Sequence, residues 1–415
     1  DWNESKDEPF VIISRSPVII YAQVEDYSGN LTWMHSAPVM TDDMPVSITA
    51  QVMPEKSGQS QPIYSAADRP YIDIDVSKPH YEENFAGLKT ISYEITCRES
   101  GDSKTGVLDS FAMELQQSQW TGTLDIDTEK FGGEVIVRIM AQDWAGNISC
   151  ETVQPFQVDT DVPEVEFIFD VSDCIGGKYF NKEKTLTIKI DEKNFDGTYM
   201  PKVTASCENG FKFDGWRTEG QKHTGTVTFI KDGTYSVVFE CADTAGNRSA
   251  PKTLEPFVID TAPPEVQVKE NGRTASGALY FDSARTLEIC ISEENFSADN
   301  VHMEVSAKHQ GKPIPAPRCG QWISEGSRHH ASVIFEQDGV YELEVWCTDL
   351  AGNQSEQRLK KYFIIDTIIP KIQISGVEDY SSNRGHVKPV ITFSDDYLAL
   401  NSIDVALTGD GQCGG

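Results

Sequence analysis

Three short phrases that each contain a carboxylate recur along this 415-residue chain. Carboxylates held close together can carry out acid–base catalysis, as in glycoside hydrolysis, or can bind a hard cation such as calcium. The first phrase, Asp-x-Ala-Gly-Asn with Ser replacing Ala in the first copy, begins at Asp26, Asp143, Asp243 and Asp349. The Asn residues that end it lie 117, 100 and 106 positions apart, so the phrase marks a unit of about one small domain.

Two further acidic phrases recur in a fixed order with the first. Asp-Thr-x-x-Pro begins at Asp159, Asp260 and Asp366, and an alternating β-branched stretch follows each copy. The third phrase reads Glu-x-Asn-Phe in three of its four copies and opens with an acidic residue at Glu82, Glu192, Glu293 and Asp395. Since a catalytic pair is normally unique and these acids repeat in every unit, we interpret them as part of the architecture.

The elements that position these phrases are β-strands. Residues 165–169, 186–190 and 287–291 alternate between apolar and polar side chains, which is typical of strands with one buried face, and no segment has a convincing helical period. Asp at the start of a tight turn accepts backbone hydrogen bonds while Gly and Asn tolerate positive φ, so Asp-x-Ala-Gly-Asn predicts a hairpin turn. A repeat of about 100 residues matches an immunoglobulin-type sandwich. The predicted fold is all-β, with tandem immunoglobulin-like β-sandwich modules in an extended array.

The same turn phrase creates Asn-x-Ser/Thr sequons, which a eukaryotic secretory pathway could glycosylate. They lie at Asn30, Asn147, Asn247 and Asn353. We favour turn geometry as the reason for the Asn, because that role alone accounts for it.

The Asp-x-Ala-Gly-Asn-x-Ser turn followed by Asp-Thr-x-x-Pro closely resembles the tandem bacterial immunoglobulin-like repeats of large secreted and cell-surface adhesins. The resemblance covers about three complete modules and two partial ones. It implies an extracellular, multi-module stalk and, in some relatives, calcium bound at module junctions.

The linker prolines divide the chain into modules. We expect the C-terminal part of a truncated module at 1–44, complete modules at 45–162, 163–263 and 264–369, and the N-terminal part of a truncated module at 370–415, so that the sequence is a fragment. The first boundary departs from the pattern, since Thr41 stands where the other linkers have Asp and Asp42 and Asp43 lie beside it.

In an immunoglobulin-type sandwich, the loop between the second and third strands and the loop between the last two lie at one pole, which faces the preceding module. The three acidic columns are therefore predicted to converge at each junction. One junction gathers Asp159, Glu192 and Asp243, the next gathers Asp260, Glu293 and Asp349, and the last holds only Asp366 and Asp395. Three carboxylates repel one another unless a cation neutralises them, which predicts possible junction calcium. The alternative is that both Asp residues cap local backbone and the loop Glu is solvated.

Composition narrows the function classes. A net charge of -30 disfavours nucleic acid and anionic membrane surfaces as partners, and no apolar run approaches the length of a membrane span. No GxSxG, HExxH, P-loop or dinucleotide-binding pattern occurs, so we expect no catalytic residues and no enzyme.

Histidine and cysteine give weaker signals. We interpret the pair His329-His330 as the surface entry to a strand rather than as a metal site. The nine cysteines lack CxxC pairs, and an odd number leaves at least one without a partner within the chain. A disulfide between Cys207 and Cys241 is the one pairing that we suggest.

The leading hypothesis is therefore a non-catalytic extracellular stalk, at the cell surface or secreted, with structural and adhesive roles. Its partner would be a host or neighbouring-cell surface protein or a glycan, and calcium is the one cofactor to consider. The alternative is a set of accessory or carbohydrate-binding modules of a larger secreted carbohydrate-active enzyme, with the irregular insertion at 311–321 as a candidate binding loop.

Overall fold

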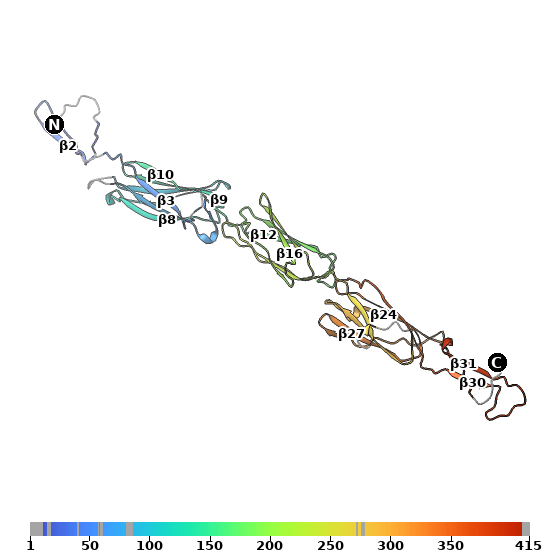
Figure 1. The fold of residues 1–415 in the computed structure, drawn as a ribbon. Coiled ribbons are helices and arrows are strands. Elements are labelled where there is room, and N and C mark those ends of the chain that lie inside the picture. Colours follow the sequence, from blue (N-terminus) through green and yellow to red (C-terminus); the bar gives the residue numbers. More distant parts are fainter. Residues whose placement is uncertain are drawn as a thin grey trace.

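The computed structural model describes residues 11–408 apart from 15–17, 40, 57, 59–60, 80–85, 271–272 and 275–278. Figure 1 shows three β-sandwiches in an extended row, with a two-stranded hairpin before the first and after the last. The described residues contain no α-helix and four short 3-10 turns, which are η1 (Ala66–Asp68), η2 (Met113–Leu115), η3 (Ala298–Asn300) and η4 (Leu400–Ser402). No helix in this part of the chain is long and apolar enough to cross a membrane. The predicted all-β tandem fold is confirmed.

The middle sandwich consists of two four-stranded sheets. One has the order β12 (Glu164–Phe169), β14 (Lys184–Asp191), β17 (Lys222–Phe229) and β16 (Phe211–Glu219). The other has the order β13 (Tyr179–Phe180), β19 (Lys252–Ile259), β18 (Gly233–Phe239) and β15 (Lys202–Ala205). All neighbours are antiparallel except β13 and β19.

The alternation of β14 explains why these sheets pack together. Leu186, Ile188 and Ile190 are at most 1% exposed and form one core with residues of the facing sheet, such as Val237 and Phe257. The intervening polar residues point outward, as the period of two requires. Burial of this apolar face is the main stabilisation of the sandwich.

The third sandwich repeats this plan. Its first sheet has the order β21 (Arg273–Thr274), β20 (Glu265–Glu270), β23 (Arg285–Ser292), β27 (Arg328–Phe335) and β26 (Ile323–Glu325). Its second sheet has the order β22 (Tyr280–Phe281), β29 (Leu359–Ile365), β28 (Gly339–Cys347), β24 (Val301–His309) and β25 (Lys312–Pro313).

The first sandwich has one smaller and one larger sheet. The smaller sheet has the order β3 (Ser47–Met53), β5 (Tyr71–Ser77) and β8 (Gln119–Asp125). The larger has the order β4 (Ile63–Tyr64), β11 (Phe156–Val158), β9 (Gly133–Asp143), β6 (Leu88–Cys97) and β7 (Ser103–Ser110), with β10 (Ile148–Thr152) also paired to β9.

A two-stranded hairpin lies on each side of the three sandwiches. The hairpins are β1 (Tyr21–Glu25) with β2 (Leu31–His35), and β30 (Lys371–Ser375) with β31 (Val390–Ser394). The strands of the three sandwiches fall within 45–162, 163–263 and 264–369. The module boundaries themselves remain a prediction.

Two expectations about individual residues are wrong. Cys207 and Cys241 are both free thiols. Cys207 lies near the start of β18, where its Sγ contacts the Tyr235 hydroxyl at 3.2 Å, whereas Cys241 follows the far end of that strand beside Ser249. The length of a strand therefore separates the two sulfurs, far beyond the reach of a disulfide.

His329 does not lie at a surface entry. It is the second residue of β27 (Arg328–Phe335), and its side chain is buried. The alternating pattern of β27 begins earlier than its aliphatic residues indicate, because His329 occupies an inward position.

Candidate metal centre

The acidic residues reach the junctions from fixed places in each sandwich. Glu192 directly follows β14, and Glu293 directly follows β23. Asp243 and Asp349 open the turns after β18 and β28, which are the second-to-last strands of their sandwiches. Both places lie at the pole that faces the preceding module, as the immunoglobulin topology requires.

The turn phrase forms the predicted hydrogen bonds. Asp243 Oδ1 accepts from the backbone N–H of Gly246 at 2.7 Å and of Asn247 at 2.9 Å, and Asp243 Oδ2 accepts from Asn247 Nδ2 at 2.8 Å. Gly246 has φ of 102°, which a residue with a Cβ rarely adopts. Asp26, Asp143 and Asp349 bind the Asn of their own turns in the same way.

The Asn that ends each turn also binds the linker. Asn247 Nδ2 donates to the carbonyl oxygen of Asp159 at 2.9 Å, and Asn353 Nδ2 donates to that of Asp260 at 2.8 Å. Both amide hydrogens of each Asn are thus used, once within the turn and once across the junction. A glycan on this nitrogen would replace one of these hydrogens, so the geometry favours the structural role of the Asn.

The side chains of the linker Asp residues point into the next module as well. Asn295 Nδ2 donates to Asp260 Oδ2 at 2.7 Å, and Asn194 binds Asp159 in the same way. These Asn residues come from the Glu-x-Asn-Phe phrase, two positions after the Glu. All three recurring phrases therefore meet at one place.

The structure brings two predicted triads together. Asp159, Glu192 and Asp243 each offer a carboxylate oxygen within 4.8 Å of the others, and so do Asp260, Glu293 and Asp349. Five of these six residues are buried, and Asp159 is half-buried. A hollow of about 480 Å³ opens beside the first triad, lined in part by Asp159, Asp161 and Glu192. Calcium prefers such oxygen ligands and completes its six to eight positions with carbonyls and water.

Burial without a cation disfavours the charged form of these acids. Burial, together with the nearby Asp260 and Asp349, raises the pKa of Glu293 to about 7 against the opposing hydrogen bond from the backbone N–H of Asn295. Burial is also the first cause of the raised pKa values of Glu192 and Asp349. Neutralisation by a proton or by a metal ion therefore stabilises each triad.

The alternative explanation of the acidic columns holds only in part. The linker Asp and turn Asp do bind local backbone amides, as that alternative expects. The loop Glu is not solvated, since Glu192 is 6% exposed and Glu293 is 7% exposed. Each Glu also accepts from the backbone N–H two residues on, at 2.8 Å for Glu192 and 2.7 Å for Glu293, but this one turn bond does not account for burial of the carboxylate beside two others.

A histidine lies behind each triad, which the sequence patterns did not reveal. His223 Nε2 lies 2.8 Å from the carbonyl oxygen of Glu192, and His329 Nε2 lies 2.7 Å from that of Glu293. The His329 ring stacks on Phe296 at 4.0 Å between centroids, and His223 packs against Phe195 at 4.8 Å. Each His stands six residues before the Phe that ends its strand, a spacing that could have identified them. They position the loop that carries the Glu.

The junction ahead of the first sandwich differs in one side chain. Lys78 directly follows β5, at the position of Glu192 and Glu293. Its Nζ lies 2.5 Å from Asp143 Oδ2 and 3.2 Å from Asp42 Oδ1, and it also donates to the carbonyl of Met44. Glu82, predicted at this position, lies outside the described residues.

Asp42 is the linker Asp of this first junction. Its carbonyl accepts from Asn147 Nδ2 at 2.9 Å, the bond that Asn247 makes with Asp159 in the next junction. The residue equivalent to Asp159 in this linker is therefore Asp42, one position after Thr41, which the linker phrases align with the Asp.

The last predicted pair does not form a triad in the described part of the chain. Asp395 caps its loop by accepting from Tyr397 N at 2.8 Å, as Glu293 does from Asn295 N at 2.7 Å. Asp366 accepts from Ile368 N at 3.2 Å. Neither residue belongs to a group of three metal-ligating side chains among the described residues.

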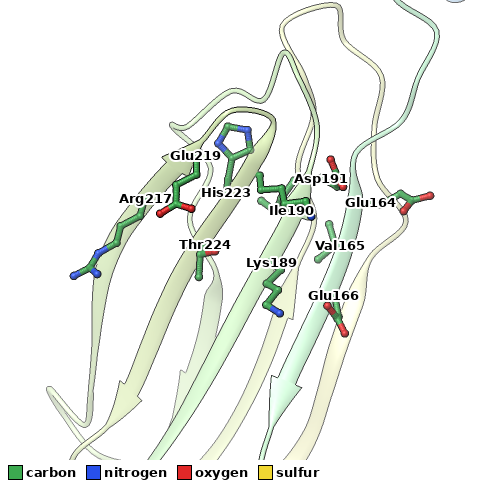
Figure 2. Close-up of a pocket in the computed structure, with 11 residues that line it drawn as sticks. Glu164, Val165, Glu166, Lys189, Ile190, Asp191, Arg217, Glu219, His223 and Thr224 are labelled. Atoms are coloured by element: carbon green, nitrogen blue, oxygen red, sulfur yellow. The ribbon is translucent and has the colours of Figure 1, made fainter.

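A separate groove of about 680 Å³ lies on the outer face of the middle sandwich. Figure 2 shows Glu166, Lys189 and Arg217, which belong to β12, β14 and β16 of one sheet. Four acidic and three basic side chains line the groove, together with the buried His223 but no Trp, Tyr or Phe. This lining has neither a dominant charge nor an aromatic platform for sugar stacking, so this groove of the middle sandwich is not a candidate sugar site.

A comparison with protein-family models matches part of the chain. Residues 224–304 match the model of the bacterial Ig-like domain, group 3. The predicted resemblance is confirmed. The match to this bacterial Ig-like domain begins in β17 of the middle sandwich and ends in β24 of the third, so it includes the linker with Asp260. No curated protein matches the sequence.

Several solved structures are similar to the chain. FdeC, an Escherichia coli adhesin, is 13% identical over 78% of this chain and 98% of that chain, with a TM-score of 0.32. Invasin, a bacterial integrin-binding protein, is 11% identical over 79% of this chain, with a TM-score of 0.36, and the match spans 62% of its length, which is less than two thirds. A Ca²⁺-stabilized, ice-binding adhesin of an Antarctic bacterium is 13% identical over 84% of this chain and 81% of that chain, with a TM-score of 0.27. At these TM-scores the similarities carry no argument about the junctions.

Proposed function

We propose that this chain is a non-catalytic extracellular stalk, with structural and adhesive roles, in which calcium rigidifies two junctions between immunoglobulin-like modules. The tandem sandwiches and the matched bacterial Ig-like domain support the spacer role. The partner at the cell surface, a protein or a glycan, is part of the same proposal. The paired carboxylates that could suggest a catalytic site repeat at successive junctions, which favours a structural role over catalysis.

The observation that carries the calcium proposal is the burial of Glu192 and Glu293 inside clusters of three carboxylates. A buried carboxylate beside two others is unfavourable unless a cation or proton neutralises it. Hard oxygen ligands in a cluster of high negative charge suit calcium.

The ligands of each proposed site come from a linker and from the module that follows it. Asp159 belongs to the linker that leaves the first sandwich, whereas Glu192 and Asp243 belong to the second. Asp260 relates in the same way to Glu293 and Asp349. An ion held by all three residues fixes the linker onto the following module and restricts bending at the junction. Beyond these two triads, Asp366 and Asp395 are proposed as two ligands of a further site, which has no third acidic side chain among the described residues.

Calcium titration calorimetry on the full chain tests this proposal. We expect binding in which Glu192→Gln and Glu293→Gln each remove one site, because each substitution deletes a charged ligand while preserving side-chain shape. Glu294→Gln is the matched control, since Glu294 is adjacent to Glu293 in sequence but exposed. Absence of binding heat at millimolar calcium would overturn the proposal, as would equal effects of Glu293→Gln and Glu294→Gln.

A further inference from the structure

The junction ahead of the first sandwich contains a cation that belongs to the protein. The Lys78 side chain is fully buried, and the three N–H donors of its ammonium match three acceptors, namely Asp42 Oδ1, Asp143 Oδ2 and the carbonyl of Met44. Asp143 is also fully buried, and Asp42 is 8% exposed by its side chain. The ammonium is therefore held between the linker and the first sandwich with all its hydrogen bonds satisfied.

This arrangement replaces one component of the acidic triads. Lys78 follows β5 as Glu192 follows β14, and Asp42 and Asp143 correspond to Asp159 and Asp243 through the same Asn bond to the linker carbonyl. Two carboxylates and one ammonium carry one net negative charge. Three carboxylates with one divalent cation carry the same charge. Exchange of Glu for Lys therefore supplies the positive charge that a divalent ion would bring.

We propose that Lys78 is a built-in cation that closes the first junction permanently, so that this junction neither needs nor binds a divalent ion. The residue directly after the strand that pairs with the first strand of each sandwich, namely β5, β14 or β23, then selects the type of junction. Lys gives a junction that is closed without metal, and Glu gives one that closes when the ion binds. The second half of this inference rests on the proposed calcium sites, whereas the role of Lys78 rests on its own contacts.

The structure provides a backbone reporter at each junction. The amide of Met44 donates to Asp42 Oδ1 at 2.9 Å, that of Asp161 donates to Asp159 Oδ1 at 3.1 Å, and that of Ala262 donates to Asp260 Oδ1 at 3.2 Å. Each of these bonds lies within the linker, but its acceptor carboxylate is also held by the following module, through Lys78, Asn194 or Asn295, so opening of the junction should release the carboxylate and expose the amide. Hydrogen exchange at these amides therefore measures closure of each junction separately.

Hydrogen-exchange mass spectrometry on the full chain, in EDTA and in millimolar calcium, tests the inference. In the wild type we expect the peptide containing Met44 to exchange at the same slow rate in both conditions. The peptides containing Asp161 and Ala262 should exchange about tenfold more slowly with calcium. Calcium dependence at Met44 would overturn the inference. Calcium independence at Asp161 and Ala262 would overturn only the proposed calcium function.

Substitutions at position 78 separate the two claims further. Lys78→Met should speed exchange at Met44 about tenfold in both conditions, whereas Lys56→Met, which removes a partly exposed ammonium from Asp68, should leave it unchanged. Slow exchange at Met44 in Lys78→Met would overturn the role of Lys78. Peptides from β6 and β9 report whether the sandwich itself has unfolded.

The reciprocal exchange keeps the test decisive if Lys78→Met destabilises the whole sandwich. Glu293→Lys should make exchange at Ala262 slow in EDTA and insensitive to calcium, since the new ammonium lies between Asp260 and Asp349. Fast exchange at Ala262 in EDTA with Glu293→Lys would overturn the proposal that this position selects the junction type.

Discussion

The junction ahead of the first sandwich and the one between the second and third share a backbone arrangement and differ in charge. In both, a turn Asn donates to the linker Asp carbonyl, at 2.9 Å for Asn147 and 2.8 Å for Asn353. In the first, the buried side chain directly after β5 is Lys78, and in the other the buried side chain directly after β23 is Glu293. The hairpin and the linker therefore set the geometry of a junction, while one side chain decides the source of its positive charge.

The linkers also differ on the side that faces the preceding module. Thr261 binds Asp232 through its hydroxyl at 3.0 Å and its amide at 3.1 Å, and Thr367 binds Asp338 likewise. Gly132 stands at the position of these two Asp residues in the first sandwich, since the following Gly133 pairs with Val158 as Gly233 pairs with Ile259. Thr160 thus has no carboxylate at this position, so the linker after the first sandwich lacks this side-chain tether and keeps the backbone bond from Asp159 N to the Tyr64 carbonyl at 2.9 Å.

The largest expected effect concerns the built-in cation. Lys78→Met leaves Asp143 buried without its partner, which should lower the free energy of unfolding of the first sandwich by about 3–5 kcal/mol, with or without calcium. Denaturant unfolding of the full chain, followed through the transition of this sandwich, measures the change. Arg138→Gln removes the exposed pair with Glu94 from the same sandwich and should cost less than about 1 kcal/mol. Equal losses of unfolding free energy in the two variants would contradict the proposed role of Lys78 as the cation that stabilises the first junction.

A smaller effect follows from protonation of Glu293. Its pKa in the folded protein, about 7, is raised above the unfolded value, so protonation stabilises the calcium-free third sandwich, and this stabilisation is lost as pH rises through 7. We expect its melting temperature in EDTA to fall by a few degrees between pH 5.5 and pH 8, about one unit on either side of that pKa.

The matched variant isolates this contribution from other titrating groups. Glu293→Gln should flatten the pH dependence of the third sandwich, and the first sandwich, with Lys78 in place of Glu, should lack this component altogether. Calcium should bind more tightly at pH 8 than at pH 6, since the proton and the ion compete for the same carboxylate. An unchanged pH profile in Glu293→Gln would show that the raised pKa does not control stability.

The smallest expected effect sharpens the difference between the linkers. Thr261→Val removes the hydroxyl bond to the exposed Asp232 and should lower the stability of the middle sandwich by about 0.5–1 kcal/mol. Thr160→Val should have no measurable effect on the first sandwich, because Gly132 offers no side-chain acceptor. Melting temperatures of the two variants give the comparison, and an equal decrease in both would contradict the proposed tether.

The sequence predicted the parts of this architecture that depend on local patterns. Alternation in β14 and β23 identified buried strands, and the repeated phrases gave the turns and the convergence of Asp159, Glu192 and Asp243. The sequence did not reveal Lys78, because the phrase at 82–85 matches the loop phrases of the later modules and so predicts Glu82 at this position. The residue that takes the position is the one directly after β5, and that strand end is not marked by a sequence motif. The distance in sequence between a strand end and such a phrase cannot be predicted from the phrase alone.

Burial and side-chain neighbours could not be derived from spacing either. Glu192 and Glu293 were expected either to bind an ion or to be solvated, and only the packing of three chain segments decides their exposure. The two buried His residues stand within alternating strands, where a polar residue at an inward position breaks the simple pattern. Their hydrogen bonds to the carbonyls of Glu192 and Glu293 explain this exception.

Calorimetric unfolding of the full chain in EDTA and in millimolar calcium is the most direct test of calcium-stiffened junctions. At a hundredfold excess over the dissociation constant, binding contributes about 2.7 kcal/mol, enough to raise a melting temperature by several degrees. The account predicts this rise for the second and third sandwiches, its loss in the third with Asp260→Asn, and no change in the first sandwich, where Lys78 supplies the charge. Equal melting temperatures in both conditions, or a rise shared by all three sandwiches, would contradict it.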